Sequence, residues 1–206
     1  MTAAEQAPPT GADLAAGQAV RAEALEGILI EKGILTSTEV DNFIETWSHR
    51  VGPMIGAKVV AKAWVDEDFK NRLLEDATAA VTDIGINPGR LERLEVVVNE
   101  PGTHNVVCCT LCSCYPWTIL GLPPGWYKSP EYRSRIVREP RTVLAEMGLA
   151  LDADVTVQVW DSSAEVRYLV IPERPAGTDD LDEEQLAELV TRDSMIGVAV
   201  PAAYTA

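Results

Sequence analysis

The stretch Val107-Cys-Cys-Thr-Leu-Cys-Ser-Cys-Tyr115 contains all four cysteines of this 206-residue chain. Three of them follow the pattern Cys109-x-x-Cys112-x-Cys114, and their sulfurs can converge on one point only if the backbone curls tightly around it. Thiolates are soft, strongly donating ligands that suit transition metals. The sequence therefore predicts a metal site built from one short loop, residues 109–114, which we call the claw.

The spacing of the claw differs from that of an ordinary structural zinc site, which takes ligand pairs from two separate segments. The single residue between Cys112 and Cys114 draws the amide nitrogens of Ser113 and Cys114 toward the metal. If both amides lose their protons, the ion would be bound by three sulfurs and two anionic nitrogens. One sulfur would be the axial ligand, and the sixth coordination position would stay open. So much negative charge favours a trivalent ion, and we advance Co(III) or Fe(III) as a hypothesis.

Clustered thiols also occur in disulfide frameworks and in structural zinc sites. A disulfide framework is disfavoured, because adjacent cysteines such as Cys108 and Cys109 make poor bridge partners. A structural zinc with His104 as its fourth ligand remains open on spacing alone. A histidine satisfied in the core is the preferred interpretation of His104. Cys108 is expected to point away from the claw, on an incoming strand, as a small core residue.

The segment Cys109-Thr-Leu-Cys-Ser-Cys-Tyr-Pro-Trp117 resembles the metal-binding signature of nitrile hydratase alpha subunits. Thr110 and Tyr115 resemble the cobalt-type branch, since the iron-type branch has Ser and Thr at these places. Cys108 departs from the pattern, which has an aliphatic residue there. Further matching fragments extend the resemblance from about residue 20 to residue 200: Val40-Asp41, Gly52-Pro53, Gly56-Ala57, Ala63-Trp64, Trp126-Tyr-Lys-Ser-Pro130, Trp160-Asp-Ser-Ser-Ala-Glu-Val-Arg-Tyr168 and Thr191-Arg-Asp-Ser-Met-Ile-Gly197.

The resemblance implies a non-corrin, low-spin Co(III) held by the three sulfurs and the amide nitrogens of Ser113 and Cys114, with Fe(III) less favoured. It makes Cys109 the axial thiolate, Cys112 a sulfinic acid and Cys114 a sulfenic acid. The family's beta subunit supplies arginines that pair with the oxidised sulfurs. An activator or metallochaperone is also expected.

The reaction that the resemblance implies is the hydration of a nitrile to an amide. The metal would bind the nitrile or activate a water, or the Cys114 sulfenate would attack the nitrile, and the sequence leaves these routes open. Cys114 and Ser113 are the expected catalytic residues. Trp117, Thr110 and Tyr115 are expected at the substrate pocket, and core packing is the competing interpretation of Trp117.

Asp161, Glu165 and Arg167 are expected to surround the metal ligands, or to form a proton route, because the family carries them in the resembling fragment. Turn capping and an ion pair on a strand face are the equally weighted alternative.

Composition restricts the function classes further. The chain has 17 basic and 32 acidic residues and a net charge of −15, which argues against a nucleic-acid partner. It lacks a run of about 18 apolar residues, so no membrane span is expected, and its N-terminus lacks the features of a signal peptide. We therefore expect a cytoplasmic enzyme subunit.

The expected fold class is α+β, with an N-terminal helical arm followed by a layered α/β sandwich domain that carries the claw. Residues 1–20 are expected to be disordered and residues 21–86 to form the arm that wraps the partner subunit. Residues 87–206 are expected to form the metal-binding catalytic domain. A helical layer packed on its own domain is the competing interpretation of the arm.

Local signals place the elements. Apolar spacing predicts a helix from Ala22 to Glu31, Thr36 and Glu39 form a capping box, and an amphipathic run extends from Asp66 to Gly85. Short strands are predicted at Leu94 to Val98 and at Asn105 to Cys109, with a turn at Pro101-Gly102 between them. Short helices are predicted at Pro130 to Val137, Pro140 to Met147 and Glu183 to Arg192. The alternating segments at residues 155–159 and 166–170 predict a β-hairpin.

Two other functions stay open. A thiocyanate hydrolase subunit shares the cobalt claw, but that branch is expected to have an arginine where this chain has Trp117, which suits a neutral nitrile better. A non-catalytic module that binds metal or senses redox state could use the same thiols.

Overall fold

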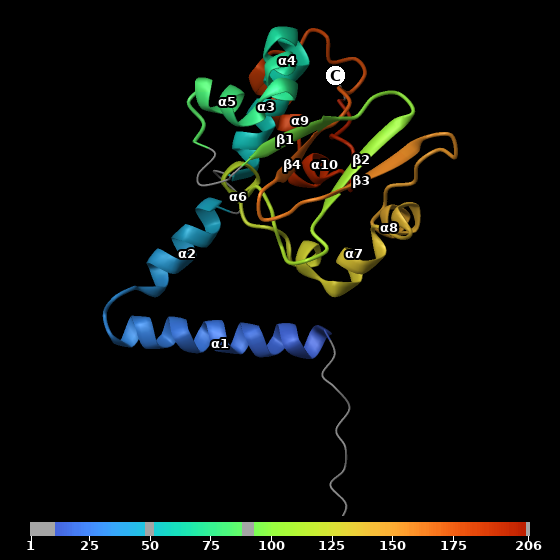
Figure 1. Ribbon diagram of the computed structural model, residues 1–206. Coiled ribbons are helices and arrows are strands. Elements are labelled where there is room, and N and C mark those ends of the chain that lie inside the picture. Colours follow the sequence, from blue (N-terminus) through green and yellow to red (C-terminus); the bar gives the residue numbers. More distant parts are fainter. Residues whose placement is uncertain (1–10, 48–51, 88–92, 205–206) are drawn as a thin grey trace, which may run out of the picture. The chain divides into compact units, whose positions relative to one another are not determined.

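The computed structural model describes residues 11–47, 52–87 and 93–204. Figure 1 labels its helices and strands in chain order. The chain divides into two compact units, Met1–Glu45 and Thr46–Ala206. The sequence predicts the change near residue 86, whereas the helices of residues 52–83 belong to the unit that carries the claw.

The first unit contains α1 (Gly11–Glu31) and α2 (Ser37–Glu45). The capping box is confirmed, because Glu39 accepts the Thr36 amide at 2.8 Å and its own amide donates to the Thr36 hydroxyl at 3.2 Å. Residues 11–20, which were expected to be disordered, are helical, and residues 1–10 lie outside the described residues. Large apolar side chains such as Leu25 and Ile34 are exposed on this unit.

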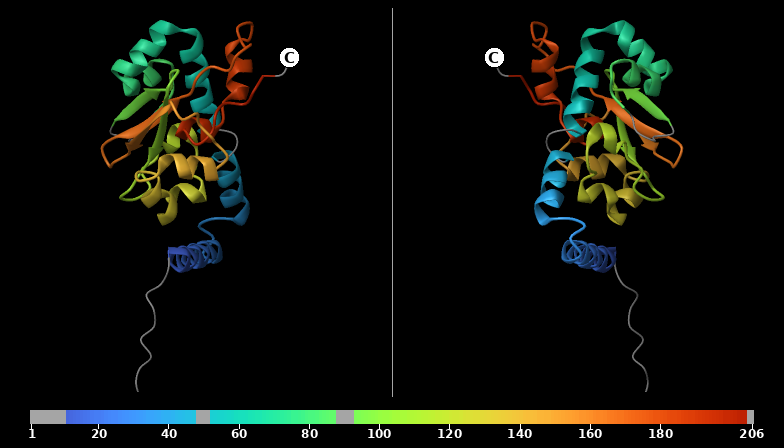
Figure 2. Two further views of the ribbon diagram at one scale, coloured as in Figure 1. Left: turned by 90° about the vertical axis from the view of Figure 1, so that its right-hand side faces the viewer. Right: turned by 90° about the vertical axis from the view of Figure 1, so that its left-hand side faces the viewer.

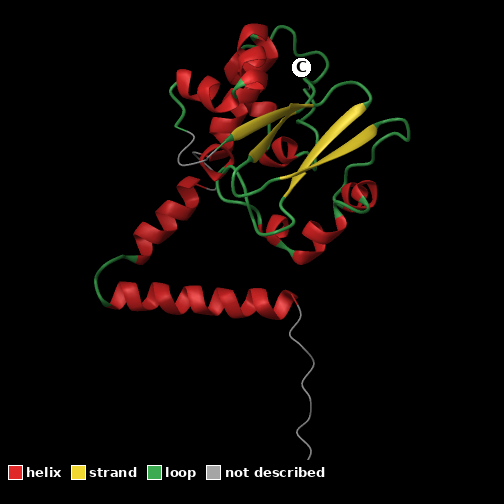
Figure 3. Ribbon diagram, viewed as in Figure 1, coloured by secondary structure: helices red, strands yellow, loops and turns green. Residues whose placement is uncertain are grey.

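The second unit is a layered arrangement of helices and strands, as Figure 3 shows, and the α+β class is confirmed. Its strands are β1 (Leu94–Val98), β2 (Thr103–Cys108), β3 (Thr156–Asp161) and β4 (Arg167–Ile171). β1 pairs with β4 and β2 pairs with β3, both in parallel. The two pairs meet where β2 lies against β4.

The predicted hairpin is wrong, although both of its strands exist. β3 and β4 are parallel partners of β2 and β1 and not of each other. The reason is burial: β2 is buried from His104 to Cys108 and β4 from Leu169 to Ile171. Such continuous buried runs are typical of parallel strands covered on both faces. The turn at Pro101-Gly102 is real, since Glu100 and Thr103 exchange backbone hydrogen bonds across it.

Helices cover the strands, as the two views in Figure 2 show. α4 (Glu67–Glu75) and α5 (Ala77–Asp83) pack on β1, α8 (Pro140–Glu146) packs on β3, and α10 (Arg192–Ile196) packs on β4 and β2. α3 (Gly52–Val65) packs on α6 (Trp117–Leu120), α9 (Glu183–Leu189) and α10. α7 (Pro130–Arg135) packs on η2 (Gly125–Lys128) and α8.

The amphipathic run from Asp66 to Gly85 forms two helices instead of one. Asp66 caps α4 by accepting the Phe69 amide at 2.8 Å, and Asp76 ends α4 and caps α5 by accepting the Ala79 amide at 2.9 Å. An aspartate is a favourable N-cap, and its capping conformation interrupts the preceding helix. The bend brings Phe69 of α4 and Val81 of α5 into the same core.

No helix among the described residues combines the length and the apolar character that crossing a bilayer requires.

Candidate metal centre

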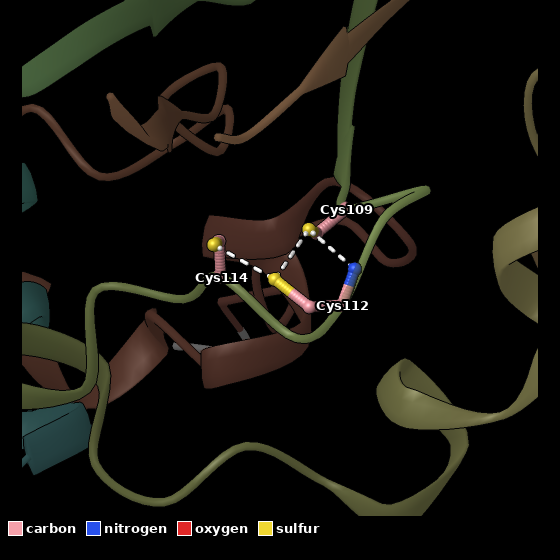
Figure 4. A group of neighbouring side chains, drawn as sticks. All are labelled: Cys109, Cys112 and Cys114. Atoms are coloured by element: carbon pink, nitrogen blue, oxygen red, sulfur yellow. Dashed lines mark hydrogen bonds between the residues drawn. The ribbon is translucent and has the colours of Figure 1, made fainter. Parts of the chain in front are cut away.

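The claw follows directly from the end of β2. In the parallel register Cys108 lies opposite Asp161, the last residue of β3. The next residue, Cys109, is fully buried, whereas Cys112 is exposed and Cys114 is half-buried. The loop therefore rises from the core to the surface and returns, with its sulfurs on the inner side of the curve (Figure 4).

The three claw sulfurs converge as the spacing predicted. The Sγ atoms of Cys109 and Cys112 lie 3.5 Å apart, those of Cys112 and Cys114 lie 3.1 Å apart, and all three are within 4.8 Å of one another. Two sulfurs that are both about 2.3 Å from one metal ion are about 3.3 Å apart at a right angle and about 3.8 Å apart at a tetrahedral angle. The 3.1 Å separation is close to the right-angled value, and the 3.5 Å separation lies between the two values.

The backbone of the claw also turns inward. The amide of Cys112 donates to the Cys109 sulfur at 3.3 Å. Hydrogen bonding from the Cys114 thiol lowers the pKa of Cys112 to about 7, and hydrogen bonds from the backbone amides of Ser113 and Cys114 act in the same direction. The two amides proposed as ligands therefore face the sulfur cluster.

The pKa values of Cys108, Cys112 and Cys114 are shifted in different directions. That of Cys112 is lowered to about 7. Burial raises the pKa of Cys114 to about 12, against the opposing positive charge of Arg167. Burial raises the pKa of Cys108 to about 12 as well. Cys108 is fully buried with its sulfur 4.0 Å from the Asp161 carboxylate, outside the sulfur cluster, as expected of a core residue.

The peptide between Cys109 and Thr110 is held from both sides. Its carbonyl accepts the Nε proton of Arg133 at 3.0 Å, and its N–H donates to Asp161 Oδ1 at 2.8 Å. Because the carbonyl and N–H of a trans peptide point in opposite directions, Arg133 and Asp161 lie on opposite sides of the loop. A second guanidinium nitrogen of Arg133 reaches the Thr110 carbonyl at 2.7 Å, and the Thr110 hydroxyl reaches Asp161 Oδ2 at 2.5 Å.

An aromatic cluster supports the returning end of the claw. The buried Tyr127 donates its hydroxyl hydrogen to the Cys114 carbonyl at 2.9 Å, and Tyr132 donates to the Val107 carbonyl at 2.7 Å. Tyr115 packs edge-on against Tyr127 with ring centroids 5.1 Å apart, and Trp126 packs edge-on against Tyr132. The roles of Arg133, Tyr127 and Tyr132 were not predicted from the sequence. Only the Trp126 to Pro130 fragment, noted for the resemblance, pointed toward this region.

The residues predicted at the substrate pocket fall in two environments. Tyr115 is buried and its hydroxyl points to the Leu120 carbonyl at 3.4 Å, so it lies in the core below the claw. Trp117 is 44% exposed and rests against Trp47, with ring centroids 5.1 Å apart. Leu111, at the tip of the claw, is 82% exposed. Leu111 and Trp117 therefore expose apolar surface in and beside the claw.

The three charged residues predicted around the ligands also separate. Asp161 contacts the claw through Thr110. Arg167 donates to the carbonyls of Ser163 and Val166, and its charge lowers the pKa of Cys114, which places it near the cluster. Glu165 instead accepts the Ser163 hydroxyl at 2.9 Å, an ordinary turn contact.

The alternative with His104 as a zinc ligand does not fit the structure. His104 is at the start of β2, about 16 Å along the strand from the claw. Its Nε2 lies 2.7 Å from the Gly197 carbonyl oxygen, and its Nδ1 lies 3.2 Å from the side-chain Nδ2 of Asn99. Both ring nitrogens are thus already hydrogen-bonded in the core. Burial lowers the pKa of His104 and keeps the ring neutral.

The fold and the site together define a metal-binding protein with a single-loop thiolate claw at the end of a parallel strand. Residues 16–199 match the family described as nitrile hydratase, alpha chain. The chain is 55% identical over 183 residues to the low-molecular-weight cobalt-containing nitrile hydratase subunit alpha of Rhodococcus rhodochrous, covering 89% of this chain and 88% of that protein. The chain belongs to the nitrile hydratase alpha-chain family.

Two further relatives show the breadth of this likeness. The thiocyanate hydrolase subunit gamma of Thiobacillus thioparus is 46% identical over 189 residues, which cover 86% of this chain and 77% of that protein. A solved structure of a double mutant of the iron-type nitrile hydratase from Comamonas testosteroni superposes with a TM-score of 0.80 at 44% identity, covering 93% of this chain and 95% of that one. Relatives thus include cobalt and iron types and a second enzyme.

Proposed function

We propose that this chain is the metal-carrying alpha subunit of a cobalt-type nitrile hydratase, which adds water across the carbon–nitrogen triple bond of a nitrile to give an amide. The observation that carries the proposal is the convergence of the Cys109, Cys112 and Cys114 sulfurs within 4.8 Å of one another. The high identity to a cobalt-containing alpha subunit supports the same assignment.

The donor set fits Co(III). The three sulfurs, together with the amide nitrogens of Ser113 and Cys114, would supply five ligands, and the two amides would lose their protons on binding. Strong anionic donors stabilise a trivalent ion relative to a divalent one. Cobalt is proposed over iron because Thr110 and Tyr115 occupy the positions at which the two branches differ and because the similar relatives include cobalt-containing subunits.

The exposure of the thiols fits their proposed final states. Cys112 and Cys114 are open to solvent to different degrees, and we propose that they become the sulfinic and the sulfenic acid, whereas the buried Cys109 stays a thiolate. The new oxygens are acceptors, and arginines of the beta subunit would pair with them. The exposed Leu111 and the exposed Cys112 lie where such a partner would cover the claw.

Cobalt bound in the claw supplies Lewis acidity, which polarises a nitrile or lowers the pKa of a water. The chain's own residues position the reactants. Ser113 is exposed between the ligands Cys112 and Cys114, and its hydroxyl would orient the attacking water. The Cys114 sulfenate oxygen would be an alternative nucleophile. The half-exposed Trp117 offers an apolar wall for the neutral nitrile carbon chain.

The helical unit Met1–Glu45 is proposed to contact the beta subunit. Leu25, Ile28 and Ile34 are between 47% and 62% exposed, and α2 has no buried residue. A helix with an unburied apolar face needs a partner to be stable in water. We further propose assembly in the cytoplasm, where thiols stay reduced until the metal arrives, with an activator that delivers it.

The proposal is tested by producing the chain with its beta subunit in the presence of cobalt and measuring metal content and intact mass. One cobalt per alpha chain and three added oxygens, mapped to Cys112 and Cys114, are the expected result. Zinc bound to unmodified thiols would rule out the centre. Thiocyanate hydrolase remains the second candidate because a gamma subunit of that enzyme is 46% identical. Rapid turnover of thiocyanate, without turnover of nitriles, would favour it.

A further inference from the structure

The claw is shaped by side chains that do not bind the metal. Arg133 from α7 and Tyr127 from η2 each donate to a carbonyl of the claw, one near its beginning and one at its end. We propose that Arg133 and Tyr127 are positioning residues that hold the empty claw in its metal-binding shape. This inference rests on the proposed metal site, and it concerns how the chain prepares that site before the ion arrives.

The role of Arg133 follows from the direction of its hydrogen bonds. Its Nε and one terminal nitrogen donate to the consecutive carbonyls of Cys109 and Thr110, at 3.0 and 2.7 Å. A planar guanidinium that binds two acceptors fixes both peptide planes at once. Since Asp161 holds the N–H of the same first peptide, the backbone at Cys109 cannot rotate. That rotation would swing the Cys109 sulfur away from the other two.

Tyr127 acts at the other end. Its ring is fully buried between Tyr115, Trp126 and Tyr132, so the hydroxyl has little freedom. It donates to the Cys114 carbonyl at 2.9 Å, which fixes the peptide that follows the last ligand. An ordinary tyrosine hydroxyl keeps its proton at neutral pH, so this group can serve as a donor.

Fixing both ends of the claw strengthens metal binding, because the entropy cost of ordering the loop is not incurred when the ion binds. Residues that orient metal ligands without touching the metal typically contribute 10- to 100-fold to affinity. Neighbouring claw sulfurs lie 3.1 and 3.5 Å apart. Side-chain contacts at both ends of the loop would maintain this spacing.

The test uses the full chain purified with its beta subunit, without metal and under reducing, oxygen-free conditions. Co(II) is titrated in, and the thiolate-to-cobalt charge-transfer absorbance reports the dissociation constant. Arg133→Met and Tyr127→Phe are expected to weaken cobalt binding by about 10- to 100-fold. They are also expected to speed amide hydrogen exchange in residues 109–115 of the metal-free protein, a readout that does not depend on turnover.

The structure offers a matched control for each variant. Arg138→Met removes an exposed guanidinium that donates to the Ser134 carbonyl, one helical turn behind it and away from the claw. Tyr204→Phe removes a tyrosine hydroxyl at a 40% exposed position, outside the claw and the aromatic cluster that supports it. Both controls are expected to leave the cobalt dissociation constant within about twofold of the wild type.

Failure of the positioning role and failure of the proposed metal centre give different results. If each variant binds cobalt as its control does, while the wild type binds it tightly, the positioning role is wrong. If the wild type takes up no cobalt, the proposed metal centre itself is wrong. Should Arg133→Met not fold, Arg133→Lys, which offers one charge centre in place of a two-donor fork, is expected to weaken binding less than tenfold. In that case Tyr127→Phe decides the question.

Discussion

Asp161, the last residue of β3, accepts the backbone amide of Thr110 at 2.8 Å and the Thr110 hydroxyl at 2.5 Å. The two residues are brought together by the parallel register, which sets Cys108 opposite Asp161. One carboxylate thus ties the first turn of the claw to the neighbouring strand, and the shape of the metal site depends on strand pairing as well as on cysteine spacing.

Asp161→Ala removes both of these acceptors. Because Asp161 is exposed, we expect the fold to survive and cobalt affinity to fall by about 10- to 100-fold, as for other residues that orient ligands. Metal content after gel filtration and nitrile turnover measure the effect. Asp154→Ala, at an exposed position before β3, serves as the control. Equal cobalt content in the two variants would mean that the Thr110 contacts do not support the claw.

Cys108→Val tests whether the fourth thiol takes part in metal loading. The side chain is fully buried and lies outside the sulfur cluster. Because valine is close to cysteine in size and is also apolar, we expect the free energy of unfolding to change by less than about 1.5 kcal/mol. Cobalt per chain should stay the same. A clear loss of cobalt in a normally folded variant would show instead that Cys108 passes the ion to the claw.

His104 is expected to make the stability of the chain depend on pH. Burial lowers its pKa below 6.5, so the folded chain binds a proton less readily than the unfolded chain. The stabilisation of the folded chain by neutral His104 is therefore complete above about pH 6.5. It is lost as the pH falls toward the lowered pKa that His104 has in the folded chain. The slope cannot exceed about 1.4 kcal/mol per pH unit for one proton.

Urea unfolding between pH 5 and 8 measures this dependence. In His104→Gln the slope that the histidine contributes should disappear, whereas His49→Gln, which removes the chain's other histidine, should keep it. A slope that survives in His104→Gln would have to come from carboxylates.

Replacement of Gly197 by alanine is expected to destabilise the fold more than replacement of Gly177. Its φ is +90°, and an added Cβ would lie 2.0 Å from the Asn105 carbonyl oxygen in β2. Gly177 has a similar φ of +76° with nothing within 4 Å of such a Cβ. Gly177→Ala should therefore destabilise the fold by about 1–2 kcal/mol through backbone strain alone. Gly197→Ala should cost about 3 kcal/mol or more because β2 must also move.

Thermal unfolding of both variants compares the two costs directly. Equal losses of stability would mean that the close approach of α10 to β2 is relaxed in solution.

The elements that could be predicted were those with local signals. The capping box of Thr36 and Glu39, the strands around Pro101-Gly102 and the proline-initiated helices at Pro130 and Pro140 are all present. Each depends on residues within a few positions of one another. The amphipathic run from Asp66 to Gly85 does not show where one helix ends and the next begins. Its apolar pattern continues across Asp76, which ends α4 and caps α5.

Strand pairing could not be predicted in the same way. The segments at residues 155–159 and 166–170 alternate as hairpin strands do, but each pairs in parallel with a strand more than 45 residues earlier in the chain. Alternation reports which side chains are buried, and it does not report which neighbour buries them. The same limit applies to Arg133 and Tyr127, whose claw contacts span 24 and 13 residues of sequence.

The sequence by itself determined the donor set of the metal site, because three cysteines within six residues can meet only on a tightly curled loop. It also carried enough of the family's pattern to indicate the reaction. The tertiary structure decided how that loop is held: which strand lies beside Cys108, which carboxylate reaches Thr110 and which donors reach the claw carbonyls. Ligand spacing is a property of the local chain, whereas these contacts exist only once parallel strands and distant helices have packed into one core.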